Sequence, residues 1–371
     1  MKIAVFHNYL DNIGGAEVVA LTLARELSAD LYTTNINPEK IRQMGFGDVL
    51  ERIISIGRLP KQAPFRQQLA FYYFRRLNLK NQYDFFIIAG DWAMSGAVNN
   101  KPNMWYAHSP LNELWAFKSY IRENILSAWK KIPYDIWVKF NRILSRRYAS
   151  FVDIFIANSL NTKKRIKHFY DKEATVIYPP VEIDKNIENI KGDYWLSVNR
   201  LITHKRIDIQ LKAFRSLPEE KLIIVGSYEK GVAQFEKYKK YLDSLKPDNV
   251  TIYHWVDNLK LKELYLKSLG FIATAKDEDF GMTPVEAMAF GKPVIAAKEG
   301  GYQESVISGK TGILIEDIDE NKLIEAIKEI KSEFQKNPDK YKEDCLARAR
   351  EFSVENFSAS IKKAIAGYFK A

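Results

Sequence analysis

Two carboxylates eight residues apart flank a short glycine loop in the second half of the chain. They are Glu278 and Glu286, and the residues between them read Asp279-Phe280-Gly281-Met282-Thr283-Pro284-Val285. A carboxylate can accept two hydrogen bonds from neighbouring hydroxyl groups of a sugar. Two carboxylates that bracket an anion site therefore suit a nucleotide sugar, which carries one sugar at each end of its diphosphate.

A strand and a helix must position these carboxylates. The apolar run 270–275 predicts a buried strand, and the helix that follows is expected to end at Gly291. Thr283 is a favourable N-cap, and Pro284 stands where a first helical residue belongs. The start of this helix would offer free N–H groups and a positive dipole end, which suit a phosphate.

Parts of this motif also have simpler explanations. Thr283 and Glu286 match a capping box, in which Glu286 would only return a hydrogen bond to the Thr283 backbone. The triplet 277–279 matches the acidic D-x-D pattern of metal-dependent sugar transferases, although short acidic triplets are common in loops. Phe280-Gly281 and the second carboxylate favour the sugar-binding interpretation over the capping box.

Three further candidates lie at expected strand ends. Gly14-Gly15 follows the strand 2–7 and opens a helix containing Glu17. A strand end, two glycines and a helix start together make a second anion-binding corner. A turn that needs a positive φ explains the glycines equally well. His108 follows the strand 103–107 and would face a ligand, although a lone histidine is usually structural. Arg200 and Lys205 share one strand-to-helix loop, where two cations could neutralise a departing diphosphate.

Strands alternate with helices along both halves of the chain, which predicts an α/β fold with parallel, doubly wound sheets. At 371 residues, two domains are expected. The polar, aperiodic stretch after Pro179-Pro180 indicates a linker, so we place the domains at 1–180 and 181–352. A final amphipathic helix covers about 353–371.

Together these motifs resemble the retaining glycosyltransferases of the GT-B fold in the glycogen-synthase-like family, the fourth family in the usual sequence classification. The resemblance implies two Rossmann-like domains that face each other across a cleft, with the final helix packed back on the first domain. It implies His108, Glu278, Arg200 and Lys205 as catalytic residues, and Glu17 near the acceptor. Donor binding is implied for Gly14, Gly15, Arg200, Lys205, Glu278, Phe280, Gly281, Met282, Thr283 and Glu286.

The same resemblance implies a reaction. We expect transfer of a hexose from a nucleotide-diphosphate sugar to a glycan or lipid-linked acceptor, with retention of configuration, without a metal or another cofactor. The segment 198–201 with Lys205-Arg206 looks most like mannosyltransferases that use GDP-mannose. Asn199 and Arg206 stand where glycines are more usual, and Tyr302-Gln303 where a small residue and proline often stand, which blurs the donor's identity.

The net charge of +10 lies entirely in the first half, with 25 Lys and Arg against 15 Asp and Glu up to Pro180, and 31 against 31 after it. Two segments, 58–76 and 129–147, interleave cations with aromatic residues. This pattern suits an anionic membrane surface, a single-stranded nucleic acid, or ordinary amphipathic helices with solvated cations. We expect the membrane surface, because no RNA-recognition or helix-turn-helix signature supports a nucleic-acid-binding protein.

Cysteine content and hydropathy indicate the cellular compartment of the protein. The single cysteine, Cys345, excludes an internal disulfide, fits a reducing compartment and is expected to be buried. The N-terminus enters a strand directly and does not resemble a signal peptide, and no run of eighteen apolar residues exists. We expect a cytoplasmic enzyme, peripheral on the inner face of the membrane. A dinucleotide-dependent oxidoreductase is the other alternative, but G-x-G-x-x-G is missing.

Overall fold

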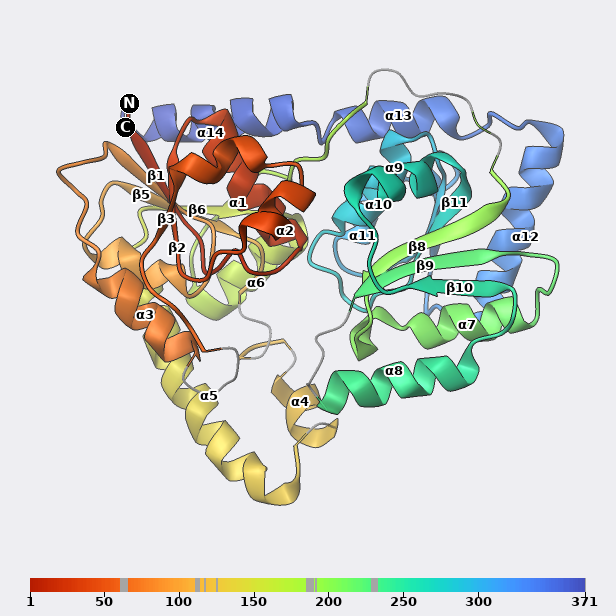
Figure 1. The fold of residues 1–371 in the computed structure, drawn as a ribbon, viewed down its shortest axis with the longest axis horizontal. Helices are drawn as coiled ribbons and strands as arrows, with labels where there is room; N and C mark the ends of the chain where they lie inside the picture. The colour runs from red at the N-terminus through yellow and green to blue at the C-terminus, as the bar shows by residue number, and fades with distance from the viewer. Residues whose placement is uncertain are drawn as a thin grey trace. The chain divides into compact units, whose positions relative to one another are not determined.

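The computed structural model divides the chain into two compact units, Met1–Pro179 with Phe357–Ala371, and Pro180–Asn356 (Figure 1). It describes residues 1–60, 66–110, 114–116, 118–124, 126–184, 190, 192–227 and 233–370. Positions 185–189 and 191 of the expected linker, and 61–65 of the first basic segment, lie outside the described residues. Each unit is an α/β domain with a parallel sheet, so the predicted fold class is confirmed.

Unit 1, the residues 1–179 and 357–371, is built on a sheet with the strand order β3-β2-β1-β4-β5-β6-β7, and every neighbouring pair is parallel. Parallel strands need crossover connections, which here are mostly helices. The strands are β1 Ile3–Phe6, β2 Asp30–Thr33, β3 Ile53–Ser55, β4 Phe85–Ile88, β5 Asn103–Ala107, β6 Ile154–Ala157 and β7 Thr175–Val176. The helices are α1 Gly15–Glu26, α2 Pro38–Gln43, α3 Arg66–Arg76, α4 Lys118–Asn124, α5 Ala128–Ala149, α6 Leu160–Tyr170 and α14 Val354–Tyr368, with the 3-10 turns η1 Gly47–Arg52 and η2 Ala93–Val98.

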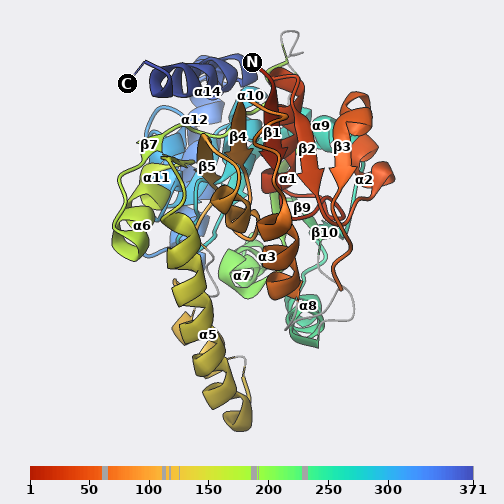
Figure 2. The same ribbon diagram turned by 90° about the vertical axis from the view of Figure 1, so that its left-hand side faces the viewer.

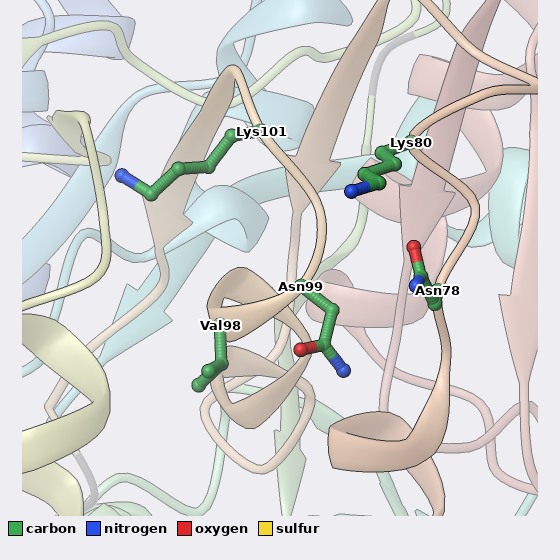
Figure 3. Close-up of a pocket in the computed structure, with 5 residues that line it drawn as sticks. All are labelled: Asn78, Lys80, Val98, Asn99 and Lys101. Atoms are coloured by element: carbon green, nitrogen blue, oxygen red, sulfur yellow. The ribbon is translucent and has the colours of Figure 1, made fainter.

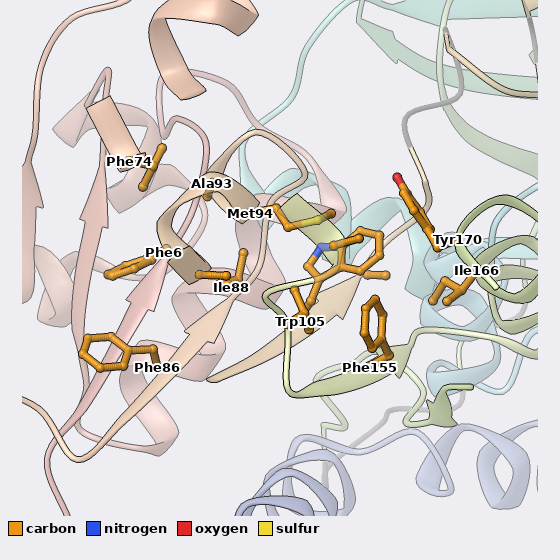
Figure 4. Close-up of a cluster of buried hydrophobic side chains, with 14 of the residues drawn as sticks. Phe6, Phe74, Phe86, Ile88, Ala93, Met94, Trp105, Phe155, Ile166 and Tyr170 are labelled. Carbon is orange, nitrogen blue, oxygen red and sulfur yellow. The ribbon is translucent and has the colours of Figure 1, made fainter. Parts of the chain in front are cut away.

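The two faces of the unit 1 sheet bury different partners. On one face, Phe86 and Trp105 join an aromatic and aliphatic core with Phe74 of α3 (Figure 4). On the other, Tyr106 meets Phe357 at 5.6 Å between ring centroids, and Phe85 lies against the end of α14. Side chains of successive strand residues point to opposite faces, which explains why both faces of β4 and β5 are apolar. The last helix of the chain is therefore part of unit 1 (Figures 1 and 2).

Unit 2, the residues 180–356, has the sheet order β10-β9-β8-β11-β12-β13, again all parallel. Its strands are β8 Tyr194–Arg200, β9 Leu222–Ser227, β10 Val250–Tyr253, β11 Ser268–Ala273, β12 Val294–Ala297 and β13 Gly312–Ile315. Its helices are α7 Ile207–Arg215, α8 Ala233–Leu245, α9 Asn258–Leu266, α10 Met282–Ala289, α11 Tyr302–Ser305, α12 Glu320–Lys336 and α13 Lys342–Arg350, with the 3-10 turn η3 Thr203–Lys205. The chain order reverses beside β8 and β11, so the loops after these two strands meet at a topological switch point, where such sheets bind ligands.

Two smaller expectations can be compared with these units. Cys345 is fully buried on α13, where its Sγ lies 3.6 Å from the carbonyl of Thr311, and burial raises the pKa of its thiol. It is the buried thiol that the sequence predicted. Among the described residues, none belongs to a helix with the length and hydropathy that a bilayer span requires.

Candidate functional site

The loop after β11 turns sharply before α10. Asp277 has φ 48° and Gly281 has φ 83°, so both lie in the left-handed region. Only glycine enters that region without a steric cost, and aspartate is one of the few other residues that tolerate it. The two turns enclose Glu278, Asp279 and Phe280 between them and hold this acidic segment at the carboxyl end of the strand.

A second glycine loop fixes the backbone of Glu278. The N–H of Gly301 donates to the carbonyl of Glu278 at 2.8 Å. A Cβ atom on Gly300 would lie 2.3 Å from that same carbonyl oxygen, so only glycine fits there. The ring of Tyr302 fills the space beside Gly281, where an added Cβ would be 2.4 Å from its Cε1. Tyr302, which departs from the usual family pattern, therefore packs directly on the loop.

Glu278 forms an ion pair with Lys205, with 2.5 Å between Oε2 and Nζ, and both side chains are mostly buried. Burial by itself raises the pKa of Glu278, but the Lys205 ammonium, with smaller effects of His204 and Arg200, outweighs it, so the pKa is lowered. The same environment lowers the pKa of His204 to about 4, chiefly through burial and the charge of Lys205. At neutral pH Glu278 is therefore an anion in contact with a fixed cation, and the nearby imidazole of His204 is neutral.

Arg206 holds the loop that carries Lys205. Its backbone has φ 50°, which explains why glycine suits this position and why a side chain there needs compensation. Its guanidinium donates to the carbonyls of Thr274 at 2.6 Å and Ala275 at 3.1 Å, and Nη2 lies 2.9 Å from Glu299. These bonds tie the loop after β8 to the end of β11. The sequence marked Arg206 as a departure from the family's usual glycine and as part of the likeness to mannosyltransferases, and gave no sign of this anchoring role.

Arg200 is the last residue of β8 and is exposed. In the part of the chain that the structure describes, its guanidinium is in no ion pair, but it is close enough to Glu278 to help lower the pKa of that carboxyl. The structure thus brings the predicted residues Arg200, Lys205 and Glu278 together at one edge of the sheet. An exposed guanidinium near a fixed ammonium is suited to a diphosphate.

Helix α10 begins two residues earlier than predicted. Its N-cap is Gly281 and its first residue is Met282, so Thr283 is not the N-cap and Pro284 lies in the third position. A proline is tolerated there because the first-turn N–H groups have no partner within the helix. The prediction was wrong because the left-handed turn at Gly281, rather than a side chain, starts the helix.

Glu286 is not in a capping box. Its Oε2 accepts a hydrogen bond from the hydroxyl of Tyr265, at the end of α9, at 2.7 Å. Burial raises the pKa of Glu286, the bond from Tyr265 opposes this, and Glu182 adds to the rise. The Tyr265 contact had no signal in the sequence, because 21 residues separate the partners and no periodicity links them.

Phe280 is a core residue through its side chain. Its ring is 1% exposed and lies 5.3 Å from the ring of Phe352. Any contact of this position with a donor would come from its backbone. The aromatic ring instead anchors the loop between Glu278 and Gly281 to the interior of unit 2.

In unit 1, the glycine pair and Glu17 form one compact corner. Gly14 is the N-cap of α1 in an extended conformation, φ −171°, so this turn does not depend on a positive φ. Gly15 is the first helical residue. The buried carboxylate of Glu17 folds back over Gly14, where an added Cβ would lie 2.6 Å from Oε2. A negative group thus already stands at the helix start that the sequence offered as an anion site.

His108 follows β5, as predicted, and lies near a second histidine at the carboxyl edge of the sheet. His7 follows β1 and donates from Nδ1 to the carbonyl of Ala89 at 3.0 Å. Burial and the neighbouring His7 lower the pKa of His108 to about 3, although the Ala89 carbonyl acts in the opposite direction. Nε2 of His108 is buried and lacks a hydrogen-bond partner in the described residues. His7 stands at a strand end and could have been found by the rule that identified His108.

Two further observations limit the extent of the candidate site. Within the described residues, no group of three or more His, Cys, Asp or Glu is arranged to hold a metal ion. A shallow pocket of about 300 Å3 is lined by Asn78, Lys80, Val98, Asn99 and Lys101 (Figure 3). These residues precede β4 and β5, at the amino end of the strands, so the pocket is not part of either set of candidate residues.

Comparison with known families covers nearly the whole chain. The family described as Glycosyltransferase Family 4 matches residues 13–185, and the family described as Glycosyl transferases group 1 matches residues 180–351. Alpha-1,3/1,6-mannosyltransferase ALG2 of Dictyostelium discoideum is 27% identical, over 85% of this chain and 86% of the relative. The enzyme of the same name from Candida glabrata is 26% identical, over 72% of this chain and 69% of the relative.

Solved structures share the fold. The crystal structure of Anabaena Alr3699/HepE in complex with UDP-glucose has a TM-score of 0.74 with 19% sequence identity, and covers 99% of this chain and 100% of its own. Sucrose-phosphate synthase from Thermosynechococcus elongatus has a TM-score of 0.72 with 16% identity, over 100% and 99% of the two chains.

The opposite pKa shifts of the two carboxylates give a stability test. A raised pKa makes ionised Glu286 a cost to the folded state at neutral pH, so Glu286→Gln should raise the melting temperature by about 2–4 °C. A lowered pKa makes Glu278 stabilising above its ordinary value, so Glu278→Gln should lower the melting temperature by a similar amount.

Thermal melts between pH 4 and 8 would measure both effects. The gain from Glu286→Gln should fade as the pH drops toward the ordinary glutamate pKa, and the loss from Glu278→Gln should begin to shrink only below that ordinary pKa. The exposed Glu343→Gln on α13 serves as the control. Shifts of the same sign for both site variants would contradict this electrostatic assignment.

Proposed function

This chain belongs to the glycosyltransferases of the GT-B fold, of the family 4 type, and on that premise we propose that it moves a hexose from a nucleotide-diphosphate sugar to a glycan or lipid-linked acceptor. Mannose from GDP-mannose is the first candidate, in line with the mannosyltransferases among its relatives. The observation that carries the proposal is the grouping of Lys205, Glu278 and Arg200 beside the start of α10.

The diphosphate would be held by the positive groups of unit 2. Lys205 is mostly buried, and a fixed cation in such a place attracts a phosphate more strongly than it would in water. Arg200 adds a guanidinium that can bind two phosphate oxygens at once. The N–H groups of Met282 and Thr283, in the first turn of α10, would complete the anion site. In this arrangement the protein's own charges stabilise the leaving group, and no metal is assigned a role.

The two carboxylates would recognise the two sugars. Glu278, ionised at neutral pH, would accept hydrogen bonds from the hydroxyls of the transferred hexose. Glu286 would hold the ribose, with Oε2 already engaged by Tyr265 and its other oxygen available to a ribose hydroxyl. The buried hydrogen bond from Tyr265 fixes the orientation of this carboxylate before the donor arrives, which lowers the entropic cost of binding.

Unit 1 would contribute to the acceptor side and to the transferred sugar. His108 is neutral at physiological pH, because its pKa is lowered to about 3, and its Nε2, which has no partner among the described residues, would make the contact with a sugar hydroxyl. We assign the Gly14-Gly15 turn to the donor diphosphate and Glu17 to the acceptor, as the family resemblance implies, and the Glu17 carboxylate would then have to turn away from Gly14 when the diphosphate binds. An enzyme with a lipid-linked acceptor would work in the cytoplasm, against the inner face of the membrane.

The reaction would retain the anomeric configuration. The acceptor oxygen would attack the anomeric carbon from the face that the diphosphate leaves. The bond between that carbon and the phosphate oxygen breaks, the bond to the acceptor oxygen forms, and the acceptor's proton leaves with the diphosphate. Lys205 and Arg200 would stabilise the negative charge that develops on the departing oxygens.

Donor binding can be tested with a thermal-shift panel of GDP-mannose, UDP-glucose, ADP-glucose and dTDP-glucose. We expect GDP-mannose to raise the melting temperature most, because ligand binding to the folded state stabilises it by mass action. Glu286→Gln should reduce that rise, since it weakens the contact with the ribose. If every nucleotide sugar left the melting temperature unchanged, the proposed donor site would be wrong.

Transfer itself should depend on Glu278. The Glu278→Gln variant keeps the shape of the side chain but loses its charge, and we expect at least about a hundredfold loss of transfer, as for other groups that stabilise a transition state. Asp279→Asn, in the same loop, is the matched control and should retain most of the activity. A Glu278→Gln enzyme that transferred sugar at the wild-type rate would show that this residue does not contact the hexose.

Activity should survive EDTA. The proposal gives the charge-neutralising role of a metal to Arg200, Lys205 and the start of α10. Transfer would be measured by release of the nucleoside diphosphate, before and after chelation and after addition of Mg²⁺ or Mn²⁺. An absolute requirement for either ion would restore the metal-binding interpretation of the triplet 277–279, and Asp279→Asn should then be inactive as well.

A further inference from the structure

Helix α5 carries a stripe of large apolar side chains that is open to solvent. The stripe consists of Trp129, Ile132, Ile136, Phe140 and Ile143, each between 54% and 74% exposed. Their spacings of three, four, four and three residues place all five on one face of the helix. At 1.5 Å per residue the stripe is about 21 Å long. Exposed apolar surface of this extent marks an interaction site.

The opposite face of α5 fastens the helix to unit 1. It buries Val138, Asn141, Ser145 and Ala149, and Trp137 packs against the aromatic core. Figures 1 and 2 show the N-terminal half of α5 extending away from the sheet of unit 1. The stripe is therefore not a misplaced part of this core, because the helix already uses its other side for packing.

Positive charge surrounds the stripe. Lys130, Lys139 and Arg147 are exposed on the same helix, whereas the guanidinium of Arg146 donates to the carbonyl of Phe169. The only acidic residue of α5, Asp135, lies 3.0 Å from Lys118 and 2.8 Å from Arg122 of α4, so its charge is neutralised locally. An apolar stripe with cations at its edges is complementary to a bilayer with anionic headgroups, into which the apolar side chains insert while the cations stay at the headgroup level.

The other basic segment of the sequence has a different surface. In α3 the apolar side chains of Ala70, Phe71 and Phe74 are buried, and only Tyr72 is strongly exposed. The two segments looked alike in the sequence, as cations interleaved with aromatic residues. The structure distinguishes the two segments. The apolar face of α3 packs on the core of unit 1, whereas the apolar stripe of α5 is exposed.

We propose that α5 lies in the plane of an anionic membrane surface, with the stripe from Trp129 to Ile143 inserted at the boundary between headgroups and acyl chains. A second copy of this chain is a poorer occupant, because two such helices would bring their cations together. The inference stands on the side chains of α5 and does not depend on the identity of the sugar donor. For an enzyme with a lipid-linked acceptor, it names the surface on which the acceptor would be met.

The full chain would be sedimented with vesicles of phosphatidylcholine alone and with vesicles that contain about 25% phosphatidylglycerol. The anionic phosphatidylglycerol supplies the negative charge that attracts the cations of α5. We expect binding to the anionic vesicles, weakened by salt. Ile132→Ser with Ile136→Ser should reduce the partition coefficient roughly tenfold, through lost apolar insertion. Lys139→Gln with Arg147→Gln should reduce it about twenty-fivefold on anionic vesicles only, at about fivefold for each cation.

Leu259→Ser, at a leucine of α9 that is 82% exposed, is the matched control and should bind like the wild type. Melting temperature and its rise with nucleotide sugars, measured without vesicles, should be equal in all variants, which separates this proposal from the proposed donor site. Failure of the wild type to bind anionic vesicles would overturn the inference. So would equal binding by the Ile132→Ser, Ile136→Ser variant, or a dimer in solution that this variant abolishes.

Discussion

The ion pair between Lys205 and Glu278 is the interaction around which the candidate site of unit 2 is arranged. Its two members come from the loops after β8 and β11, which lie far apart in the sequence and meet only because the order of the sheet reverses there. Arg206 binds one loop to the other, and the N–H of Gly301 donates to the carbonyl of Glu278.

The surroundings of the two site carboxylates differ in a way that matches different tasks. Glu278 has a cation in contact, so burial does not neutralise it, and its charge remains available. Among the described residues Glu286 has a phenol in contact and no cation, so burial raises its pKa and makes its ionised form costly until a hydroxyl ligand arrives. Perturbed carboxylates of this kind tend to gather at functional sites, because folding alone gains little from them.

The sequence predicted the fold class and the placement of residues at strand ends, because alternation of strands and helices determines where those ends meet. It could not predict contacts that depend on three-dimensional packing. Gly281 was recognised as part of the loop, but its left-handed turn moved the start of α10 to Met282. The partner of Glu286 lies on another helix, and the exposure of the stripe on α5 depends on which face of that helix the rest of unit 1 covers.

Because α14 returns to unit 1, unit 2 is inserted within the sequence of unit 1 and does not simply follow it. During synthesis, the apolar surface around Phe85 and Tyr106 stays uncovered until α14 has left the ribosome. Unit 2, in contrast, has all of its strands before that point and can fold while the first unit is still incomplete. A nascent chain of this topology exposes its aromatic surface longest, and there a chaperone would have its greatest opportunity to bind.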